Sequence, residues 1–310
     1  MHNSILHTFF LYAFFGPLFG YSLLLIFGRF FLKENSFYWS EILTVPLAIP
    51  VVALLLFWGK PCPLLTLTNS SFKSFGSFLC FVGDIVSNYF APVFLFAALY
   101  GVGELIKPYL TFSRFLKKTG LLKQDEQLEA IIAELTAKMG VIGVRSYVAP
   151  GKMTAFTFNF LKPKVVIGEE YAKSLTKDEL KAVFAHELAH IKARDSLVIS
   201  LCQFATYLYF FVPGLKKYFQ EILYYRELSA DKVALGYLGE KENLAQALVK
   251  TCKFEASKAW ISFAGDNDVE LRRMQAIIES DLKIPTRNLY YYIFLGFIVT
   301  LSLFFLYYIC

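Results

Sequence analysis

Histidine is scarce in this chain, which has only four among its 310 residues. Two of these, His2 and His7, lie within the first seven residues, so the rest of the sequence contains only His186 and His190. Cysteine is scarce too, and no two cysteines have the short spacing of zinc ribbons and fingers. A cysteine-based zinc module is therefore excluded. The five cysteines lie mostly in apolar stretches and are predicted to be buried free thiols: Cys62, Cys80, Cys202, Cys252 and Cys310.

Charge is also sparse, because only 18% of the residues are charged whereas 56% are hydrophobic, including 33 phenylalanines and 19 tyrosines. The mean hydropathy of +0.48 is unusual for a soluble enzyme. Residues 9–27, 42–59 and 289–310 have no charge, and residues 78–102 have one acid, Asp84. Each run is long enough, or nearly so, to cross about 30 Å of hydrocarbon as a helix. We expect four membrane helices, the first of them retained because no basic segment or cleavage site marks a signal peptide.

Basic residues flank the third and fourth of these runs, and they predict the orientation of the chain. By the positive-inside rule, residues 105–287 form a cytoplasmic domain between a membrane region, residues 1–104, and a last membrane helix, residues 288–310. We expect a multi-pass protein of a bacterial inner membrane. These flanks explain the net charge of +6, so nucleic-acid binding is not expected. The flanking residues are Lys107, Arg114, Lys117, Lys118, Lys123, Lys283 and Arg287.

The two remaining histidines flank a glutamate in the run His186-Glu187-Leu188-Ala189-His190. On an α-helix, positions i and i+4 lie on one face, so both imidazoles can reach one ion while Glu187 lies beside its open position. The pattern is typical of zinc peptidases, although it also occurs in helices that bind no metal. Thr176 and Glu179 form a capping box upstream, so the pattern is predicted to lie in the middle of a helix.

A catalytic zinc ion needs three protein ligands, and no third histidine follows residue 7. Glu227 and Asp231 lie at i and i+4 of a second predicted helix. Glu227 can bind zinc while Asp231 orients a ligand histidine. The alternative is an exposed helix face on which Arg226 and Lys232 pair with these acids. The nearby histidine pair favours the zinc site.

A longer pattern surrounds these residues. It includes residues 184–191, Arg194-Asp195, Phe211-Val212-Pro213 and Arg226-Glu227 with Asp231, preceded by the stretch 155–175. Over roughly residues 105–285 it resembles the BlaR/MecR-type integral membrane zinc metallopeptidases. The resemblance implies an α-helical membrane protein with a gluzincin-like, α+β zincin-type domain inserted between membrane helices three and four. It also implies one Zn²⁺ held by His186, His190 and Glu227, with Glu187 as general base and Asp231 behind a ligand histidine. The antibiotic sensors of that family have an extracellular receptor domain after the last membrane helix, which this sequence lacks, so antibiotic sensing is not expected.

The apolar residues 197–214 separate the histidines from Glu227. A single membrane crossing would place the ligands on opposite sides, so we expect an embedded helix that returns, broken near Pro213-Gly214. HtpX-type membrane proteases share both motifs but have two membrane helices in this interval. One apolar segment here favours the BlaR/MecR-type interpretation.

Strands are predicted at residues 144–148, 154–160 and 165–167 before the zinc helix. Zinc peptidases with this helix commonly bind substrate as an added strand, and a hairpin that serves only the core is an equal alternative. The segment nominated for substrate consists of Ala155, Phe156, Thr157, Phe158 and Asn159.

The expected function is a zinc endopeptidase that hydrolyses a cytoplasmic or membrane-proximal protein in signalling or regulated proteolysis. The alternatives are HtpX-like quality control and a noncatalytic membrane scaffold or receptor subunit. The expected partners are a protein or peptide substrate and the lipid bilayer, together with a second copy of the chain or a separate sensor protein. A donor for the oxyanion is not evident, and Arg226 is one candidate.

Overall fold

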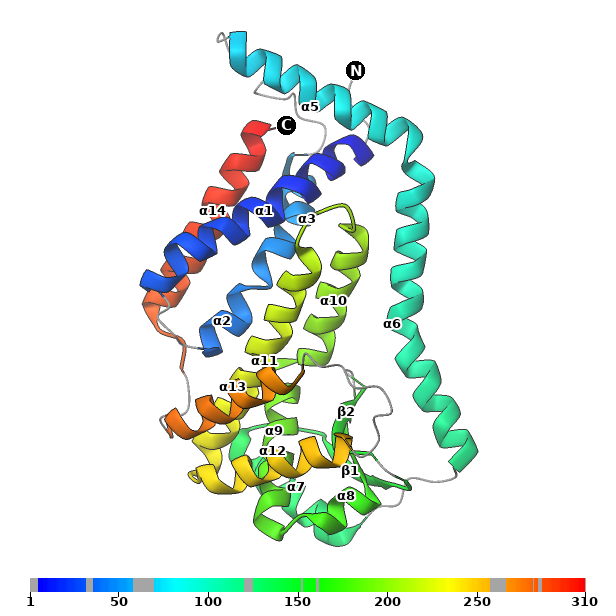
Figure 1. The fold of residues 1–310 in the computed structure, drawn as a ribbon, viewed down its shortest axis with the longest axis vertical. Coiled ribbons are helices and arrows are strands. Elements are labelled where there is room, and N and C mark those ends of the chain that lie inside the picture. Colours follow the sequence, from blue (N-terminus) through cyan, green and yellow to red (C-terminus); the bar gives the residue numbers. More distant parts are fainter. Residues whose placement is uncertain are drawn as a thin grey trace. The chain divides into compact units, whose positions relative to one another are not determined.

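The computed structural model describes residues 5–31, 36–57, 70–119, 125–151, 153–159, 162–256, 266–280, 282–283 and 286–309. Over these ranges the chain is mostly helical with one small sheet (Figure 1). It divides into two compact units. The first comprises Met1–Leu105, Leu201–Ile222 and Arg287–Cys310, and the second comprises Ile106–Ser200 and Leu223–Thr286.

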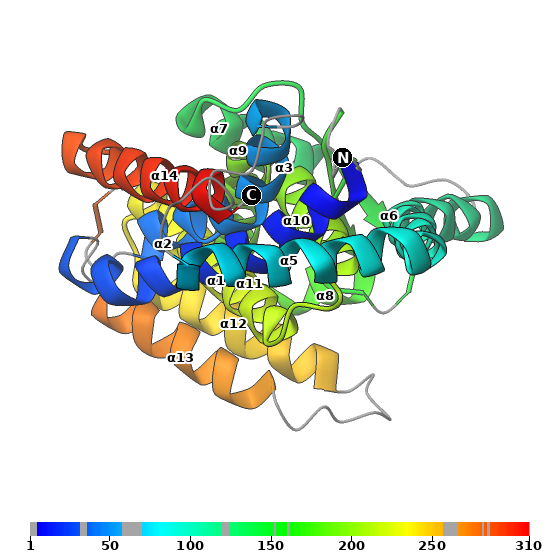
Figure 2. The ribbon, with the colours of Figure 1, turned by 90° about the horizontal axis from the view of Figure 1, so that it is seen from above.

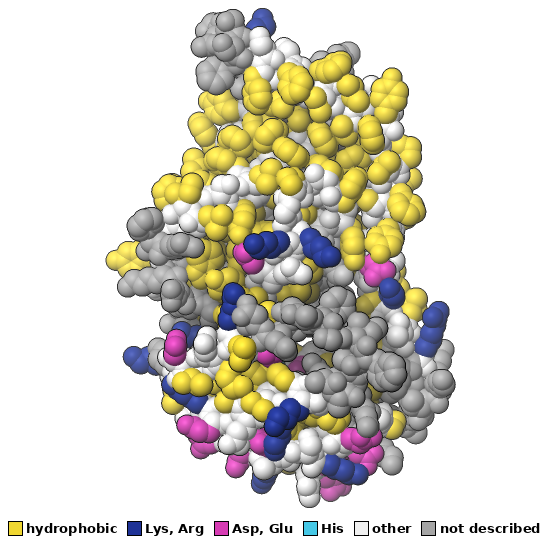
Figure 3. All heavy atoms as spheres, in the orientation of Figure 1, with side chains coloured by type: hydrophobic (Ala, Val, Ile, Leu, Met, Phe, Trp, Pro, Cys, Tyr) yellow, Lys and Arg dark blue, Asp and Glu magenta, His cyan; other side chains and the backbone are white. Residues whose placement is uncertain are grey.

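The first unit is built from long apolar helices. Helix α1 packs against α3, α5 and α14, and hydrophobic side chains cover the visible face of this unit (Figure 3). Four helical segments among the described residues are long and apolar enough to cross a membrane, which agrees with the expected number: Ile5–Gly28, Phe37–Phe57, Ala91–Arg114 and Leu289–Ile309. The helices are α1 (Ile5–Phe31), α2 (Ser36–Ile42), α3 (Val45–Phe57), α5 (Ser70–Tyr89), the first half of α6 (Ala91–Thr119) and α14 (Leu289–Ile309).

The third span differs from the expectation of a continuous helix over residues 78–102. Helix α5 ends at Tyr89 and α6 begins at Ala91, with Pro92 in its first turn. Proline has no N–H to donate to the carbonyl four residues earlier, and its ring clashes there, so α5 cannot continue through this position. The candidate span is therefore Ala91–Arg114, and Arg114 lies at its end instead of following it.

Because the helix is interrupted here, Asp84 is not inside a membrane helix as expected. It lies on α5, outside the candidate spans, where its Oδ1 is 2.9 Å from Nδ1 of the buried His7. A Cβ on the neighbouring Gly83 would lie 2.6 Å from the His7 ring, so glycine makes room for this imidazole. The ion pair is a contact between α1 and α5.

The second unit is a three-stranded sheet with helices packed on it. The strand order is β1-β3-β2, with β1 parallel and β2 antiparallel to β3. Strand β2 is thus an edge strand, and it contacts the helix that carries the histidine pair, α9 (Lys177–Ala193). The strands are β1 (Arg145–Ala149), β2 (Phe156–Phe158) and β3 (Lys164–Gly168), close to the predicted segments except that β2 is shorter.

The core of this unit lies between the sheet and its helices. Fully buried side chains of β3 and α9, among them Ile167, Phe184 and Leu188, meet Ala234 of α11 and Leu248 of α12 in one cluster. Helices α12 and α13 pack against each other (Figures 1 and 2). The remaining helices of this unit are α7 (Glu126–Met139), α8 (Glu169–Ser174), α12 (Lys241–Ala256) and α13 (Asp266–Glu279), together with the second half of α11 (Leu215–Leu238).

The predicted capping box of α9 is confirmed. The Thr176 hydroxyl accepts from the Glu179 backbone N–H at 3.3 Å, and the Glu179 carboxylate accepts from the Thr176 backbone N–H at 2.6 Å. Lys250 of α12 donates to the same carboxylate at 2.6 Å. Burial raises the pKa of Glu179, but Lys250 and the Thr176 N–H outweigh it, so the pKa lies below the ordinary value. This ionised carboxylate fixes the start of the metal-site helix.

Because the folded-state pKa of Glu179 is depressed, its stabilising contribution is present above the unfolded-state pKa and is lost as pH falls through the folded-state pKa. We expect Glu179→Gln to lower the free energy of unfolding of the zinc-free chain by about 1 kcal/mol at pH 7, since Lys250 is partly exposed. The difference from wild type should begin to shrink below about pH 4, where the unfolded chain binds the proton, and should vanish once the folded-state carboxyl is protonated as well. Thermal unfolding in detergent with EDTA at several pH values measures this, and an equal difference at acidic pH would contradict it.

Candidate metal centre

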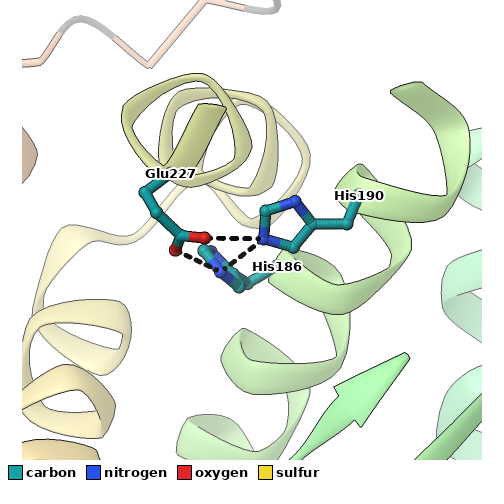
Figure 4. A group of neighbouring side chains, drawn as sticks. All are labelled: His186, His190 and Glu227. Carbon is teal, nitrogen blue, oxygen red and sulfur yellow. Dashed lines mark hydrogen bonds and ion pairs between the residues drawn. The ribbon is translucent and has the colours of Figure 1, made fainter. Parts of the chain in front are cut away.

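Three predicted ligands meet between α9 and α11 (Figure 4). His186 and His190 project from one face of α9, one turn apart, and Glu227 reaches them from α11. The two Nε2 atoms are 3.0 Å apart. Glu227 Oε2 lies 3.4 Å from His186 Nε2, and its Oε1 lies 3.5 Å from His190 Nε2.

These spacings fit a tetrahedral zinc ion. Ligand atoms bonded to zinc at about 2.0–2.2 Å in a tetrahedron lie roughly 3.3–3.6 Å from one another. The two Nε2 atoms are 3.0 Å apart, and each of them has a different oxygen of Glu227 at 3.4 or 3.5 Å, so all three contacts lie close to this range. Among the described residues, no other group of three histidine, cysteine or acidic side chains has this proximity. The donor set of two imidazoles and one carboxylate is one that catalytic zinc sites use.

A carboxylate lies behind each histidine. His190 Nδ1 is 2.6 Å from Asp195 Oδ2, and His186 Nδ1 is 2.8 Å from Asp231 Oδ1, close but poorly aligned for a hydrogen bond. These carboxylates favour a proton on each Nδ1, which leaves the Nε2 lone pairs facing each other. Two such acceptors at 3.0 Å require a cation or a proton between them. Asp231 thus lies beside Nδ1 of His186, and Asp195 lies in the corresponding position beside Nδ1 of His190.

Two buried arginines hold these carboxylates in turn. Arg226 Nη1 donates to Asp195 Oδ1, and Arg273 of α13 donates to both oxygens of Asp231, at 2.9 and 3.0 Å. The hypothesis that Arg226 stabilises the oxyanion is therefore wrong, because its guanidinium is buried and bonded to Asp195. The alternative of an exposed acidic face on α11 is wrong too, since Asp231 is only 3% exposed.

The ionised carboxylates dominate the electrostatics. Burial lowers the pKa of His186, but the carboxylates of Asp231 and Glu227 outweigh burial and raise it to about 10. Burial raises the pKa of Glu227, yet His186, His190 and Arg273 together shift it well below the ordinary value. Without metal, the site thus holds a positive charge on an imidazole. A divalent cation can replace that proton, so metal binding releases protons.

Glu187, the predicted general base, is held by the edge strand. The Thr157 hydroxyl donates to Glu187 Oε2 at 2.8 Å, so the middle of β2 lies against the carboxylate. Phe156 and Phe158, whose side chains alternate with Thr157, contact Phe112 of α6, and Tyr109 stacks on Phe158. The nominated strand segment therefore has one face on the metal-site helix and the other on α6.

The two ends of this segment differ. Ala155 packs against the core of the second unit. Asn159 has a positive φ of 67°, which ends the strand, and its side-chain oxygen accepts from the Lys162 N–H at 3.3 Å. A cavity of about 330 Å³ begins here and reaches His190, so it opens beside the metal centre. Its walls are formed by Gly140, Val141, Ile142, Thr157, Asn159, Pro163, His190, Ile191, Lys192, Arg194 and Ser196.

The apolar interval between the ligand helices contains a turn instead of a crossing. Helix α10 (Asp195–Leu208) is followed by a turn that ends at Gly214, with φ of 77°, and α11 runs back (Figure 1). The turn lies near Pro213-Gly214, where a break was expected, but the chain between His190 and Glu227 forms two helices, α10 and the first half of α11, where a single apolar segment was expected. Hydropathy missed the second because α11 begins with Lys216 and Lys217.

The fold and the site together define the class of membrane metallopeptidases. The chain matches the family model described as BlaR1 peptidase M56 over residues 82–275, more than half of its length, and it belongs to that family. The resemblance to BlaR/MecR-type peptidases is thereby confirmed.

Individual relatives come from two groups. The chain is 25% identical to the Regulatory protein BlaR1 of Staphylococcus aureus over 183 residues, which cover 56% of this chain and 31% of that protein. It is 28% identical to the Protease HtpX homolog of Archaeoglobus fulgidus over 125 residues, 40% of this chain and 36% of the relative. It is 29% identical to the Protease HtpX homolog 2 of Methanosarcina mazei over 161 residues, which cover 40% of this chain and 54% of that relative. The matched part thus spans about a third to about half of these relatives.

The single-segment argument against HtpX-type proteases does not hold. The interval contains α10 and the first half of α11, and several HtpX homologs match this chain. The comparisons support both groups as relatives of this chain.

Proposed function

We propose that this protein is a membrane-embedded zinc-dependent endopeptidase that hydrolyses peptide bonds of a cytoplasmic or membrane-proximal protein. The observation that supports it most is the convergence of His186 Nε2, His190 Nε2 and the two oxygens of Glu227 at contacts of 3.0–3.5 Å, with Glu187 beside His186 on the same helix. These three residues hold one Zn²⁺, and Asp231 and Asp195 orient the imidazoles. Zinc, when bound, acts as a Lewis acid that polarises a carbonyl and lowers the pKa of water.

Within this proposal, the chain's own groups move the proton. Glu187 accepts a proton from the attacking water and returns it to the leaving amine. Thr157 donates to Oε2 of this carboxylate, which fixes its orientation and leaves Oε1 to accept the proton. The residue that donates to the oxyanion is not assigned, and Arg226 is excluded by its bond to Asp195.

The substrate binds as an added strand at Ala155–Asn159 in this proposal, because β2 is the edge of the sheet and contacts α9. The cavity beside His190 can take a substrate side chain, since Thr157 and Asn159 form part of its wall. A strand added to β2 would therefore pass along both the general base and this cavity.

The domain plan remains the one proposed from sequence, with residues 105–287 inserted between membrane helices three and four. The divisions between the compact units at residues 105/106 and 286/287 support these limits, although Leu201–Ile222 groups with the first unit. We place this domain in the cytoplasm of a bacterial cell, because Arg114 lies at the end of the third candidate span and Lys283 and Arg287 precede the fourth; Lys107 lies inside the third span. Lys117, Lys118 and Lys123, which contribute to the same argument, lie outside the residues whose side chains are described.

The proposal predicts metal-dependent cleavage. We expect the detergent-purified chain to contain one zinc ion and to cleave an extended substrate such as β-casein, or its own chain. Incubation with 1,10-phenanthroline should stop cleavage, and added Zn²⁺ should restore it, because three ligands remain in place. Gel electrophoresis and metal analysis measure both effects. Cleavage that resists the chelator would contradict the proposal, and a folded chain without zinc would favour the scaffold alternative.

The substrate range distinguishes the two peptidase functions. A signalling peptidase, suggested by the similarity to the Regulatory protein BlaR1, should cut one partner at one position. A quality-control protease, suggested by the HtpX homologs, should cut many unfolded chains. Mass spectrometry of the products from β-casein separates a single cut from many.

A further inference from the structure

Arg273 of α13 contacts two carboxylates of the metal centre, those of Asp231 and Glu227, although α13 supplies no ligand. Arg273 Nε donates to Asp231 Oδ2 at 2.9 Å, and its Nη2 donates to Asp231 Oδ1 at 3.0 Å. The third nitrogen, Nη1, lies 3.2 Å from Glu227 Oε2. The residue is 9% exposed, so this guanidinium lies in the interior of the second unit.

We propose that Arg273 is a positioning residue that sets the geometry of the third zinc ligand. Two of its nitrogens donate hydrogen bonds to Asp231, and the third forms an ion pair with Oε2 of Glu227. The held oxygen, Oε2, also lies 3.4 Å from His186 Nε2, and Oε1 lies 3.5 Å from His190 Nε2, so a guanidinium that fixes this carboxylate sets the position of both oxygens relative to the two imidazoles. The inference rests on the proposed zinc centre.

The need for such a residue follows from the charges. Glu227 and Asp231 lie one turn apart on α11, and their ionised side chains repel each other at low dielectric constant. A glutamate also has rotatable bonds that would let its carboxylate turn away from the two imidazoles. A planar guanidinium offsets one of the two negative charges and fixes both orientations, which the single-point ammonium of lysine cannot do.

The two arginines of the centre are not equivalent. Arg226 acts on His190 only through Asp195. Arg273 acts on His186 through Asp231 and also touches a ligand directly. The metal centre is therefore complete only when α13 is docked, because Arg273 comes from that helix.

Three variants test this. Arg273→Lys keeps the buried charge but loses the planar fork, Arg273→Gln keeps a donor without the charge, and Arg272→Gln changes the neighbouring exposed arginine as a control. Zinc affinity is measured by competition with a chelator, and the visible spectrum of the Co²⁺-substituted protein reports the ligand arrangement. Thermal unfolding of the zinc-free chains measures any purely structural role.

For Arg273→Lys we expect a zinc Kd roughly 10–100-fold weaker and a changed Co²⁺ band, while Arg272→Gln matches wild type. An unchanged band would overturn the inference even if the affinity falls, because Glu227 would then keep its geometry without the fork. If neither Arg273 variant folds, the role is structural and the inference is wrong. If wild type itself binds no zinc, the proposed function fails first, so the two failures are distinguishable.

Discussion

Glu187→Gln abolishes peptide cleavage and leaves one zinc ion bound per chain. Glutamine keeps the shape of the side chain and can still accept from the Thr157 hydroxyl, but it cannot accept a proton from water. General base catalysis by a positioned side chain contributes typically about 10²–10⁴-fold, so kcat/KM should fall by at least this factor. The ligand atoms come from other residues, so metal binding is preserved.

Cleavage rate and zinc content must be measured on the same preparation. Glu170→Gln, on the exposed first turn of α8, is a matched control for the loss of a glutamate and should behave as wild type. Cleavage by Glu187→Gln at the wild-type rate would remove Glu187 from the mechanism. Loss of zinc together with activity would instead mean that this carboxylate supports the metal.

Local periodicity explains what the sequence could predict of this centre. His186 and His190, like Glu227 and Asp231, are spaced i and i+4, so each pair shares a helix face whatever the rest of the fold does. The capping box is equally local, because Thr176 and Glu179 are three residues apart.

Contacts between distant segments could not be predicted in this way. Arg273 lies 42 residues after Asp231, and Thr157 lies 30 residues before Glu187. Nothing in a helical arginine or a strand threonine distinguishes a metal-site residue from a surface residue. Asp195 offered more of a signal, since it follows His190 by five residues and begins the next helix.

The membrane helices show a second limit of local analysis. A hydropathy window averages over the residues around Pro92 and therefore predicts one continuous helix. The structure has two helices there, α5 and α6, because Pro92 has no N–H to donate to the preceding turn. Similarly, the second run was predicted to be one membrane helix over residues 42–59. The chain is instead interrupted at Leu43-Thr44, between α2 and α3, and Pro50 is inside α3.

Some expectations fall on parts of the chain without a description. Gly59 and Cys310, the predicted ends of two membrane runs, and Cys62 lie outside the described residues. The other three cysteines form no disulfide among the described residues: Cys80 and Cys202 are buried, as predicted, and Cys252 is only half-buried.

Removal of the carboxylate ligand should have the largest effect on the metal. We expect Glu227→Ala to bind zinc more than roughly 100-fold more weakly than wild type, beyond the effect typical of residues behind the ligands. Two imidazoles from one helix would remain, and Arg273 would lose one of its anionic partners and leave a positive charge near the ion. Both changes disfavour a divalent cation.

Zinc stoichiometry after dialysis against a weak chelator measures this loss. Glu242→Ala, an exposed glutamate of α12, is the matched control and should retain one zinc ion. Asp231→Ala should lie between them, at roughly 10–100-fold weaker binding, because it removes only the partner of His186. Zinc affinity should therefore decrease in the order wild type, Asp231→Ala, Glu227→Ala. This order distinguishes a zinc ligand from a residue that only orients a ligand. If Glu227→Ala retained zinc as tightly as Asp231→Ala, the third ligand would have to be another residue.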